Sequence, residues 1–238
     1  MKARGGSPVG SFVARLSDAV LTSPLGATLL SPSRVRQPRR YLRGLATPRI
    51  LDLGCGNHSP TFFRFGIPDC SYTGVDSSVY NNTSADLGRA DRLLFLDLEQ
   101  THLEDLPNGT FDLVVTSHIL EHLKRGVAML DYAIPKLRQG GILFVAYPSP
   151  ASVSFPHMKG TLNFYDDPTH VTLIGRDDLT RVVHKHGMQI LDTGTSRSSI
   201  GLVIMLFRIV TSPLFGGITG PMFWDLYGFE DYLVAIKR

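Results

Sequence analysis

The chain has 238 residues, of which 43% are hydrophobic and 19% are charged, and its formal net charge is +3. This length and composition indicate a globular protein with a core large enough for one α/β domain. The two cysteines, Cys55 and Cys70, stand in no CxxC or Cys/His ligand spacing, so a disulfide framework and a zinc site are both without support.

Residues 1–47 are rich in Pro, Gly, Ser and Arg, and the only acidic residue among them is Asp18. We expect a basic, flexible N-terminal arm with one short helix near residues 11–22 and an extended linker over residues 31–40. Such an arm is either simply solvated or in contact with anionic lipid headgroups. Nucleic acid is not expected as a partner, because no basic and aromatic binding motif accompanies the charge.

The same N-terminal residues also bear on the compartment. They lack the apolar run of a secretory signal, so we expect a cytoplasmic protein, with peripheral membrane contact as an option. Their Arg- and Ser-rich, acid-poor composition would suit an organellar transit peptide over residues 1–40 if the source is eukaryotic.

From Arg49 onward, aliphatic strands alternate with helical segments, which predicts βαβ units and a parallel sheet with helices on both faces. The clearest helical segments are residues 119–138, broken before Pro135, and residues 176–186, ended by Gly187. We predict a second unit of the chain, the domain proper, over residues 48–238. The expected strands are residues 49–53, 72–76, 93–96, 111–116, 141–147, 188–194 and 231–236.

Residues 198–224 form an apolar insertion before the last strand, and Arg208 is its only charge before Asp225. Arg208, Pro213 and several glycines argue against a regular membrane-spanning helix, which needs about 20 mostly apolar residues. We expect a buried β-hairpin insertion or a dimer surface, and a membrane-facing or lipid-binding element is the alternative.

The first predicted strand leads into a glycine turn, in the stretch ILDLGCGNHS at residues 50–59. In open parallel sheets a ligand binds beyond the carboxyl ends of the strands, where strand order reverses. Asp52, Gly54, Cys55 and Gly56 belong to this edge. Glycine allows backbone to approach a ligand closely, so the turn is a candidate cofactor loop.

The following strands bring further candidates to the same edge. Asp76, followed by Ser77, ends the second strand 24 residues after Asp52, where a carboxylate can accept hydrogen bonds from both ribose hydroxyls. Asp97 and Leu98 follow the third strand and could meet an adenine amino group and ring face. The fourth strand delivers Thr116, Ser117 and His118 next to the transferable part of a ligand.

A nicotinamide dinucleotide site is the competing interpretation of the glycine turn. Its fingerprint requires a third glycine where Ser59 stands, so that the helix N-terminus can meet a pyrophosphate. The pattern better fits a ligand that contains adenosine but no pyrophosphate, and an NAD(P)-dependent oxidoreductase is disfavoured.

With these residues in place, the chain resembles the class I S-adenosylmethionine-dependent methyltransferases. The segments ILDLGCGNHS, YTGVDSS, the stretch from Leu96 to Leu123 that contains LEH, and LRQGGILFVAYPS resemble four motifs of that family in order. The resemblance covers residues 48–195 and implies a Rossmann-like sheet of seven strands with the last antiparallel. It implies that Asp52, Gly54 and Gly56 border the methionine moiety, that Asp76 holds the ribose, and that Asp97 with Leu98 frames adenine.

A second segment, NFYDDPTHVTLIGRDDLTRVVHKHGMQIL, resembles a D-P-T-H-V segment of methyltransferases associated with glycan and cell-envelope biosynthesis. The resemblance places Asp167 and His170 in a long loop after the fifth strand, above the carboxyl edge of the sheet. A loop of this length in a compact domain is usually functional or disordered, and its aromatic residues favour order.

An oxygen acceptor must lose a proton during methyl transfer, which a histidine or carboxylate can accept. We predict His118 and His170 as catalytic candidates, with Asp167 as an orienting group; each has a purely structural alternative. His122 is not nominated, and Glu121 is expected to stabilise either the N-terminal turn of a helix or the cofactor loop. Asp166, Asp167 and His170 could ligate a divalent metal, but such groups are commoner without one, so no metal is predicted.

The sequence therefore predicts an S-adenosylmethionine-dependent methyltransferase that modifies oxygen on a glycan, a lipid-linked compound or a small molecule. The absence of an N-P-P-Y/F-type motif after the fourth strand, where TSHI stands, argues against amide or exocyclic-amine acceptors. An inactive relative that keeps the nucleotide pocket as a binding scaffold is the alternative, because fold does not establish activity. Oligomeric state has no signal in the sequence.

Overall fold

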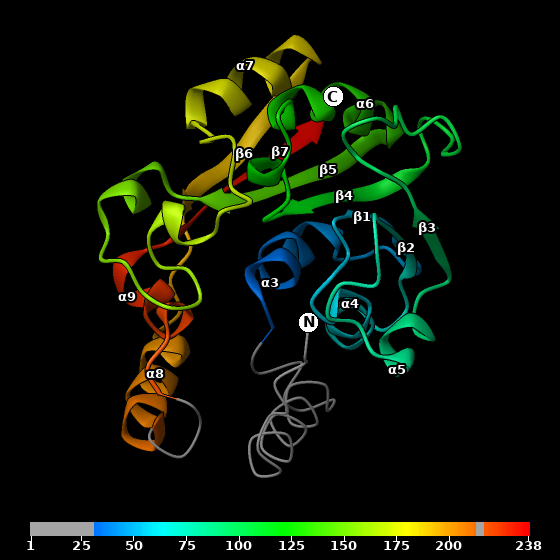
Figure 1. Ribbon diagram of the computed structural model, residues 1–238. Coiled ribbons are helices and arrows are strands. Elements are labelled where there is room, and N and C mark those ends of the chain that lie inside the picture. Colours follow the sequence, from blue (N-terminus) through cyan, green and yellow to red (C-terminus); the bar gives the residue numbers. More distant parts are fainter. Residues whose placement is uncertain (1–30, 213–216) are drawn as a thin grey trace, which may run out of the picture.

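The computed structural model describes residues 31–212 and 217–238, and in these residues a seven-stranded sheet forms the centre (Figure 1). Its strand order is β3-β2-β1-β4-β5-β7-β6. The first five strands are parallel, and β7 runs antiparallel between β5 and β6. The strands are β1 (Arg49–Leu53), β2 (Ser71–Asp76), β3 (Arg92–Phe95), β4 (Phe111–Ser117), β5 (Leu137–Pro148), β6 (Met188–Thr195) and β7 (Glu230–Lys237).

All seven predicted strands are present, and the Rossmann-like class with an antiparallel last strand is confirmed. Aliphatic runs such as Ile50 to Leu53 form the central strands because both of their faces are covered by helices. Since strand order reverses between β1 and β4, the carboxyl ends of these two strands frame the crevice in which such sheets bind ligands.

Two hydrophobic cores lie on the two faces of the sheet. Helices α6 (Gly126–Ala133) and α7 (Arg176–Lys185) pack on one face, where Leu51 and Leu53 point. Helices α3 (Ser33–Arg39) and α4 (Ser59–Gly66) pack on the other, with Ile50 (Figure 1). The alternation along β1 follows from the two-residue period of a strand. The short α5 (Ser84–Leu87) follows β2.

The extended linker expected over residues 31–40 is wrong, because this segment forms α3 and continues into the 3₁₀ turn η1 (Arg40–Leu42). Val35 is fully buried in the core against α4, and a side chain on Gly66 would meet it at 2.3 Å. Burial of an apolar stripe stabilises a helix that local composition does not favour. The short helix expected near residues 11–22 lies outside the described residues.

The helix expected over residues 119–138 is shorter than predicted. The chain forms the 3₁₀ turn η2 (Leu120–His122), then α6, then the 3₁₀ turn η3 (Ile134–Lys136) before β5 begins. Gly126 allows this fold-back, because a Cβ there would lie 1.9 Å from the carbonyl oxygen of Leu120. The turn therefore holds Glu121 and His122 directly after the carboxyl end of β4.

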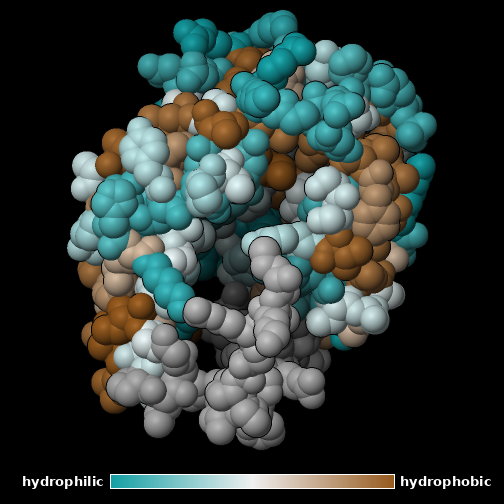
Figure 2. Space-filling view, viewed as in Figure 1, coloured by the Kyte–Doolittle hydropathy of each residue, from teal (hydrophilic) through white to brown (hydrophobic). Residues whose placement is uncertain are grey.

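The β-hairpin expected in the apolar insertion is also wrong. Residues 198–212 and 217–224 contain helix α8 (Ser199–Thr211) and the turn η7 (Gly220–Phe223), and α9 (Trp224–Tyr227) follows. The side chain of Ser198 caps α8 by accepting a hydrogen bond from the Gly201 amide. Helix α8 projects beyond the sheet, and Figure 2 shows a hydrophobic edge where it lies.

Candidate active site

The glycine turn after β1 lies where the sequence places it, and its conformation requires glycine. Gly54 has a positive φ of +82°, and a Cβ there would lie 2.9 Å from Cβ of Ile119. Its amide donates to the carbonyl of Val75 at 2.8 Å, which joins the turn to the neighbouring strand β2. The turn therefore closes tightly onto the chain that leaves β4.

A loop after β2 covers the outer side of this turn, and the sequence interpretation missed it. The Asn57 amide donates to the Tyr80 carbonyl at 3.0 Å, and Asn82 Nδ2 donates to the Cys55 carbonyl at 3.0 Å. A Cβ on Gly56 would lie 2.9 Å from the same Tyr80 oxygen, so glycine is needed for this closure. The pair Asn81-Asn82, whose side chains hydrogen-bond to backbone in turns, was the available signal.

Asp52 is completely buried beneath the turn. Its Oδ2 accepts hydrogen bonds from the hydroxyls of Ser59 at 2.5 Å and Tyr72 at 2.6 Å, whereas Oδ1 has no partner. Burial raises the pKa of Asp52 above its usual value. Cys55 is also buried and packs against Gly74, so it fills space, and burial raises the pKa of its thiol.

Asp76 stands at the carboxyl end of β2, beside Asp52 in the next strand but closer to solvent. Its Oδ1 accepts a hydrogen bond from the Ser78 amide at 3.2 Å, and Ser77 next to it is exposed. Because one interaction with a backbone amide uses only part of its acceptor capacity, the carboxylate can accept further donors. This is the capacity that a ribose requires.

The two candidate residues after β3, Asp97 and Leu98, differ in their exposure to solvent. Asp97 is exposed, and its carboxylate accepts hydrogen bonds from Glu99 and Gln100 within its own turn. Leu98 is only 7% exposed and belongs to the core on the α6 face. The adenine contacts that the resemblance implies for these two residues stay predictions, and Leu98 presents little surface in this state.

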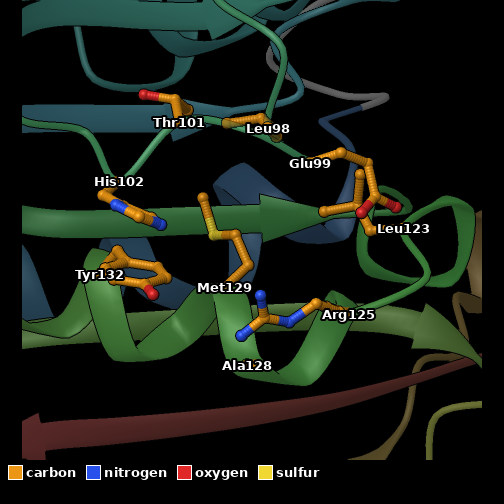
Figure 3. A pocket seen from close by; sticks show the side chains of 9 residues that line it. All are labelled: Leu98, Glu99, Thr101, His102, Leu123, Arg125, Ala128, Met129 and Tyr132. Atoms are coloured by element: carbon orange, nitrogen blue, oxygen red, sulfur yellow. The ribbon is translucent and has the colours of Figure 1, made fainter.

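A small cavity beside Leu98 does not provide the space that an adenine ring requires. Figure 3 shows it between the loop after β3 and helix α6, where the rings of His102 and Tyr132 stack with centroids 4.3 Å apart. The cavity has a volume of about 20 Å³, enough for a single water molecule. A nucleoside therefore cannot enter it.

His118 follows β4 and lies between two carboxylates. Its Nδ1 donates to Glu121 at 3.2 Å and its Nε2 donates to Glu230 at 2.9 Å, with the Trp224 ring centroid 5.2 Å away. Burial lowers the pKa of His118, but the hydrogen bonds and charges of both carboxylates outweigh this and raise it to about 10. His118 is therefore protonated on both ring nitrogens at neutral pH. Ser117, the residue before it, is 7% exposed.

The loop after β5 brings His170 and Asp167 to turn η2. The amides of Val171 and Thr172 both donate to the Glu121 carbonyl, at 2.9 and 3.0 Å. His170 Nδ1 donates to the Phe164 carbonyl at 2.7 Å, and Asp167 Oδ2 lies 3.9 Å from its Nε2. The structure thus places these two predicted residues together, next to the turn that holds Glu121.

Asp166, by contrast, is engaged inside its loop. Its carboxylate accepts hydrogen bonds from the backbone amides of Met158, Leu162 and Asn163 and from His157. Burial opposes ionisation, but these donors lower its pKa to about 2. Asp166 orders the loop, and the residue that accompanies His170 is instead His122, which the sequence interpretation had set aside.

A wider cavity of about 330 Å³ opens beside His118, between α3, α8 and α9. Glu230 and Trp224, both in contact with His118, form its inner end. Its walls combine apolar side chains and serines with two exposed arginines and two carboxylates, those of Asp225 and Glu230. The residues that define this character are Ile200, Ile204, Met205, Met222, Arg36 and Arg208.

Taken together, the carboxyl edge of β1, β2 and β4 fits an adenosyl ligand without pyrophosphate. Asp52 Oδ1 is a buried oxygen with no partner, and Asp76 retains acceptor capacity near the same turn. Both lie beside the reversal of strand order, and the cavity beyond His118 can hold a second molecule. A cofactor and an acceptor would therefore meet near Ser117 and His118.

A family model described as a methyltransferase domain matches residues 15–193, and the chain therefore belongs to this methyltransferase family. Its fold is shared with solved S-adenosylmethionine-dependent methyltransferases. It is similar to a ubiquinone biosynthesis O-methyltransferase of Mesorhizobium japonicum, with 36% identity over 121 residues, which cover 47% of this chain and 45% of that protein. A protein of the same name from Rhizobium leguminosarum is 26% identical over 204 residues, covering 81% of this chain and 79% of the relative.

Among the curated relatives of that name, three matches span only about half of the relative's length, at 45%, 43% and 50%. Solved structures agree in fold. A SAM-dependent methyltransferase from Archaeoglobus fulgidus superposes with a TM-score of 0.54 and 20% identity, covering 95% of this chain and 100% of that one. A second one, from Mesorhizobium loti, superposes with a TM-score of 0.56 and 18% identity, covering 87% of this chain and 99% of that one.

Proposed function

We propose that this methyltransferase transfers the methyl group to a hydroxyl oxygen of an amphipathic, lipid-linked acceptor. The observation that carries the proposal is the cavity beside His118, where apolar side chains share the wall with serines, with two arginines and with the carboxylates of Asp225 and Glu230. Such a lining suits a molecule with an apolar body and a polar or anionic group. Glycans and free small molecules remain the other acceptors that the sequence allows.

Oxygen as the accepting atom has two independent supports. The segment TSHI after β4 lacks the side chains that hold an amide or an exocyclic amine in methyltransferases with an N-P-P-Y/F-type motif. The similar curated proteins are named ubiquinone biosynthesis O-methyltransferases, which points to oxygen chemistry in these relatives. We extend to this chain the type of accepting atom, and not their substrate.

For the cofactor, we propose that Gly54, Gly56 and Asp52 border its methionine part and that Asp76 holds its ribose. We assign Ser77, Cys55, Ser117, Asp97 and Leu98 to the surrounding wall. When bound, the cofactor supplies a sulfonium methyl; the carbon–sulfur bond breaks, its electron pair stays on sulfur, and a carbon–oxygen bond forms. The side chains need mainly to align the two molecules, which can contribute about 7–11 kcal/mol.

The hydroxyl must also lose its proton. His118 holds a proton between Glu121 and Glu230, so we assign it to binding the acceptor by donation rather than to proton removal. In its neutral form His170 donates from Nδ1 to Phe164 and keeps a lone pair on Nε2. Asp167 beside it would stabilise the charge if His170 accepts the proton.

Helix α8 suggests how a lipid-linked acceptor reaches the cavity. One side of the helix lines the cavity through Ile204 and Met205, and the other presents Val203, Phe207 and Val210, exposed by 68%, 68% and 79%. A group of exposed apolar side chains of this kind marks a surface that contacts a membrane or another protein. No helix in residues 31–212 or 217–238 is long and apolar enough to span a membrane. We propose peripheral contact through α8.

The acceptor class is tested by incubating the enzyme with methyl-labelled S-adenosylmethionine and a cell extract, followed by mass spectrometry. We expect labelled methyl in a lipid-soluble product when wild-type enzyme is used, and much less with Asp76→Ala. Label confined to water-soluble glycans or metabolites would overturn the lipid-linked acceptor. Label on nitrogen would overturn the proposed chemistry.

A further inference from the structure

Three side chains with metal-ligating atoms gather after the carboxyl end of β4, on the Glu121 side of His118. Glu121 and His122 come from turn η2, and His170 comes from the loop after β5. One ligand atom of each lies within 4.8 Å of those of the other two. Ligands on opposite sides of one cation, with bonds of about 2.1–2.4 Å, are about 4.2–4.8 Å apart. The cluster therefore has the size of a coordination site.

The hydrogen bonds of both histidines leave the same ring nitrogen available. His170 donates from Nδ1 to the Phe164 carbonyl at 2.7 Å. The Thr169 hydroxyl donates to Asp167 at 2.6 Å, so at its contact with His122 Nδ1, 2.8 Å away, it can only accept. Each neutral ring then carries its proton on Nδ1 and a lone pair on Nε2. Metal-bound histidines are fixed in this way by a second partner.

Glu121 supplies the second observation. The residue is completely buried, its Oε1 accepts from His118 at 3.2 Å, and its Oε2 has no hydrogen-bond partner. An enclosed carboxylate oxygen without a partner is costly, unless a bound group satisfies it. A cation in contact with His122 and His170 would be such a group.

We propose that Glu121, His122 and His170 bind one divalent cation. Two imidazoles and one carboxylate favour a borderline transition metal such as Mn²⁺, Fe²⁺ or Zn²⁺ over Mg²⁺ or Ca²⁺, which prefer oxygen ligands. Asp167 and Thr169 orient His122 from outside the coordination sphere, and the Phe164 carbonyl does so for His170.

A cation here deepens the proposed function and, in this respect, rests on it. Three protein ligands would leave positions for the hydroxyl oxygen of an acceptor that reaches past His118, and the cation would lower the pKa of that hydroxyl. With the cation bound, the proton would leave to water, and His170, which is assigned to proton removal in the absence of a cation, would be a ligand instead. Binding of the cation alone does not depend on methyl transfer.

The test measures ion binding by the full chain after removal of metals with a chelator. Calorimetry with Zn²⁺ and electron paramagnetic resonance with Mn²⁺ are expected to show one saturable site. His122→Gln and His170→Gln should each weaken binding by at least about 10-fold. His184→Gln, which changes an exposed histidine of α7, is the matched control and should bind as the wild type does.

Absence of saturable binding at millimolar ion, or unchanged binding in both ligand variants, would overturn the site. If a ligand variant fails to fold, Thr169→Val provides the test, because Thr169 is exposed and its loss frees the His122 tautomer. Weaker ion binding by Thr169→Val supports the site, and unchanged binding contradicts it. Calorimetry with S-adenosylhomocysteine, run in parallel, separates failure of the methyltransferase proposal from failure of the ion site.

Discussion

Replacement of Asp76 should weaken cofactor binding without destabilising the fold. The carboxylate is partly exposed at the end of β2, and its only hydrogen bond among those described is the 3.2 Å contact with the Ser78 amide. Hydrogen bonds to a charged group contribute about 1.5–3 kcal/mol each. Two ribose hydroxyls at the lower end of this range give about 3 kcal/mol, or about 100-fold in affinity.

Asp76→Asn provides a graded comparison, because the amide keeps one acceptor oxygen while the charge is lost. We expect about 100-fold weaker binding of S-adenosylhomocysteine by Asp76→Ala and about 10-fold weaker binding by Asp76→Asn. Isothermal calorimetry measures both, and thermal unfolding without ligand checks that each variant is folded. Wild-type affinity in Asp76→Ala would refute the assignment of the ribose to β2.

Three further outcomes test other parts of the chain. Burial opposes ionisation of Asp86, but donors from Thr61, Thr83 and His58 lower its pKa to about 2, so acid titration should remove about 2 kcal/mol as pH falls from about 5 to 2. Asp86→Asn, followed by chemical denaturation at each pH, should lose this part of the pH dependence; an unchanged profile would contradict it. Gly54→Ala should lower the free energy of unfolding by more than about 1 kcal/mol in urea titrations, since its positive φ and the nearby Ile119 both disfavour a side chain, and wild-type stability would show that the turn can relax. Phe207→Glu should reduce co-sedimentation with anionic vesicles while leaving stability unchanged, because the ring is 68% exposed, and undiminished sedimentation would argue against membrane contact through α8.

The strands were predictable because each is a short run of apolar residues, which is the local pattern of a strand that is buried on both faces. The helix at residues 33–39 was not, since Val35 becomes buried only against α4 and the sheet. Helix α8 was misassigned for a related reason. Its stretch is apolar on nearly all sides, so periodicity does not distinguish a helix from a strand there.

The candidate site shows the same division. The positions of Asp52, Gly54 and Asp76 at the carboxyl ends of their strands follow from local pattern and topology. The state of His118 depends on Glu230, which is 112 residues away in sequence. His122 is not predicted as a site residue because the sequence places it in a helix start, and its proximity to His170 arises from the fold of the loop after β5. Contacts between residues so far apart in the chain cannot be predicted from the spacing of residues in the sequence.

Strand β7 determines which part of the site forms last during synthesis of the chain. It is the last strand of the sheet to be made, yet it must insert between β5 and β6, and its first residue is the partner of His118. A ribosome-bound chain that still lacks it exposes the unpaired edges of two neighbours and leaves His118 with one carboxylate. Nascent chains can therefore assemble the glycine turn early, but the acceptor end of the cleft is completed only when β7 inserts between β5 and β6.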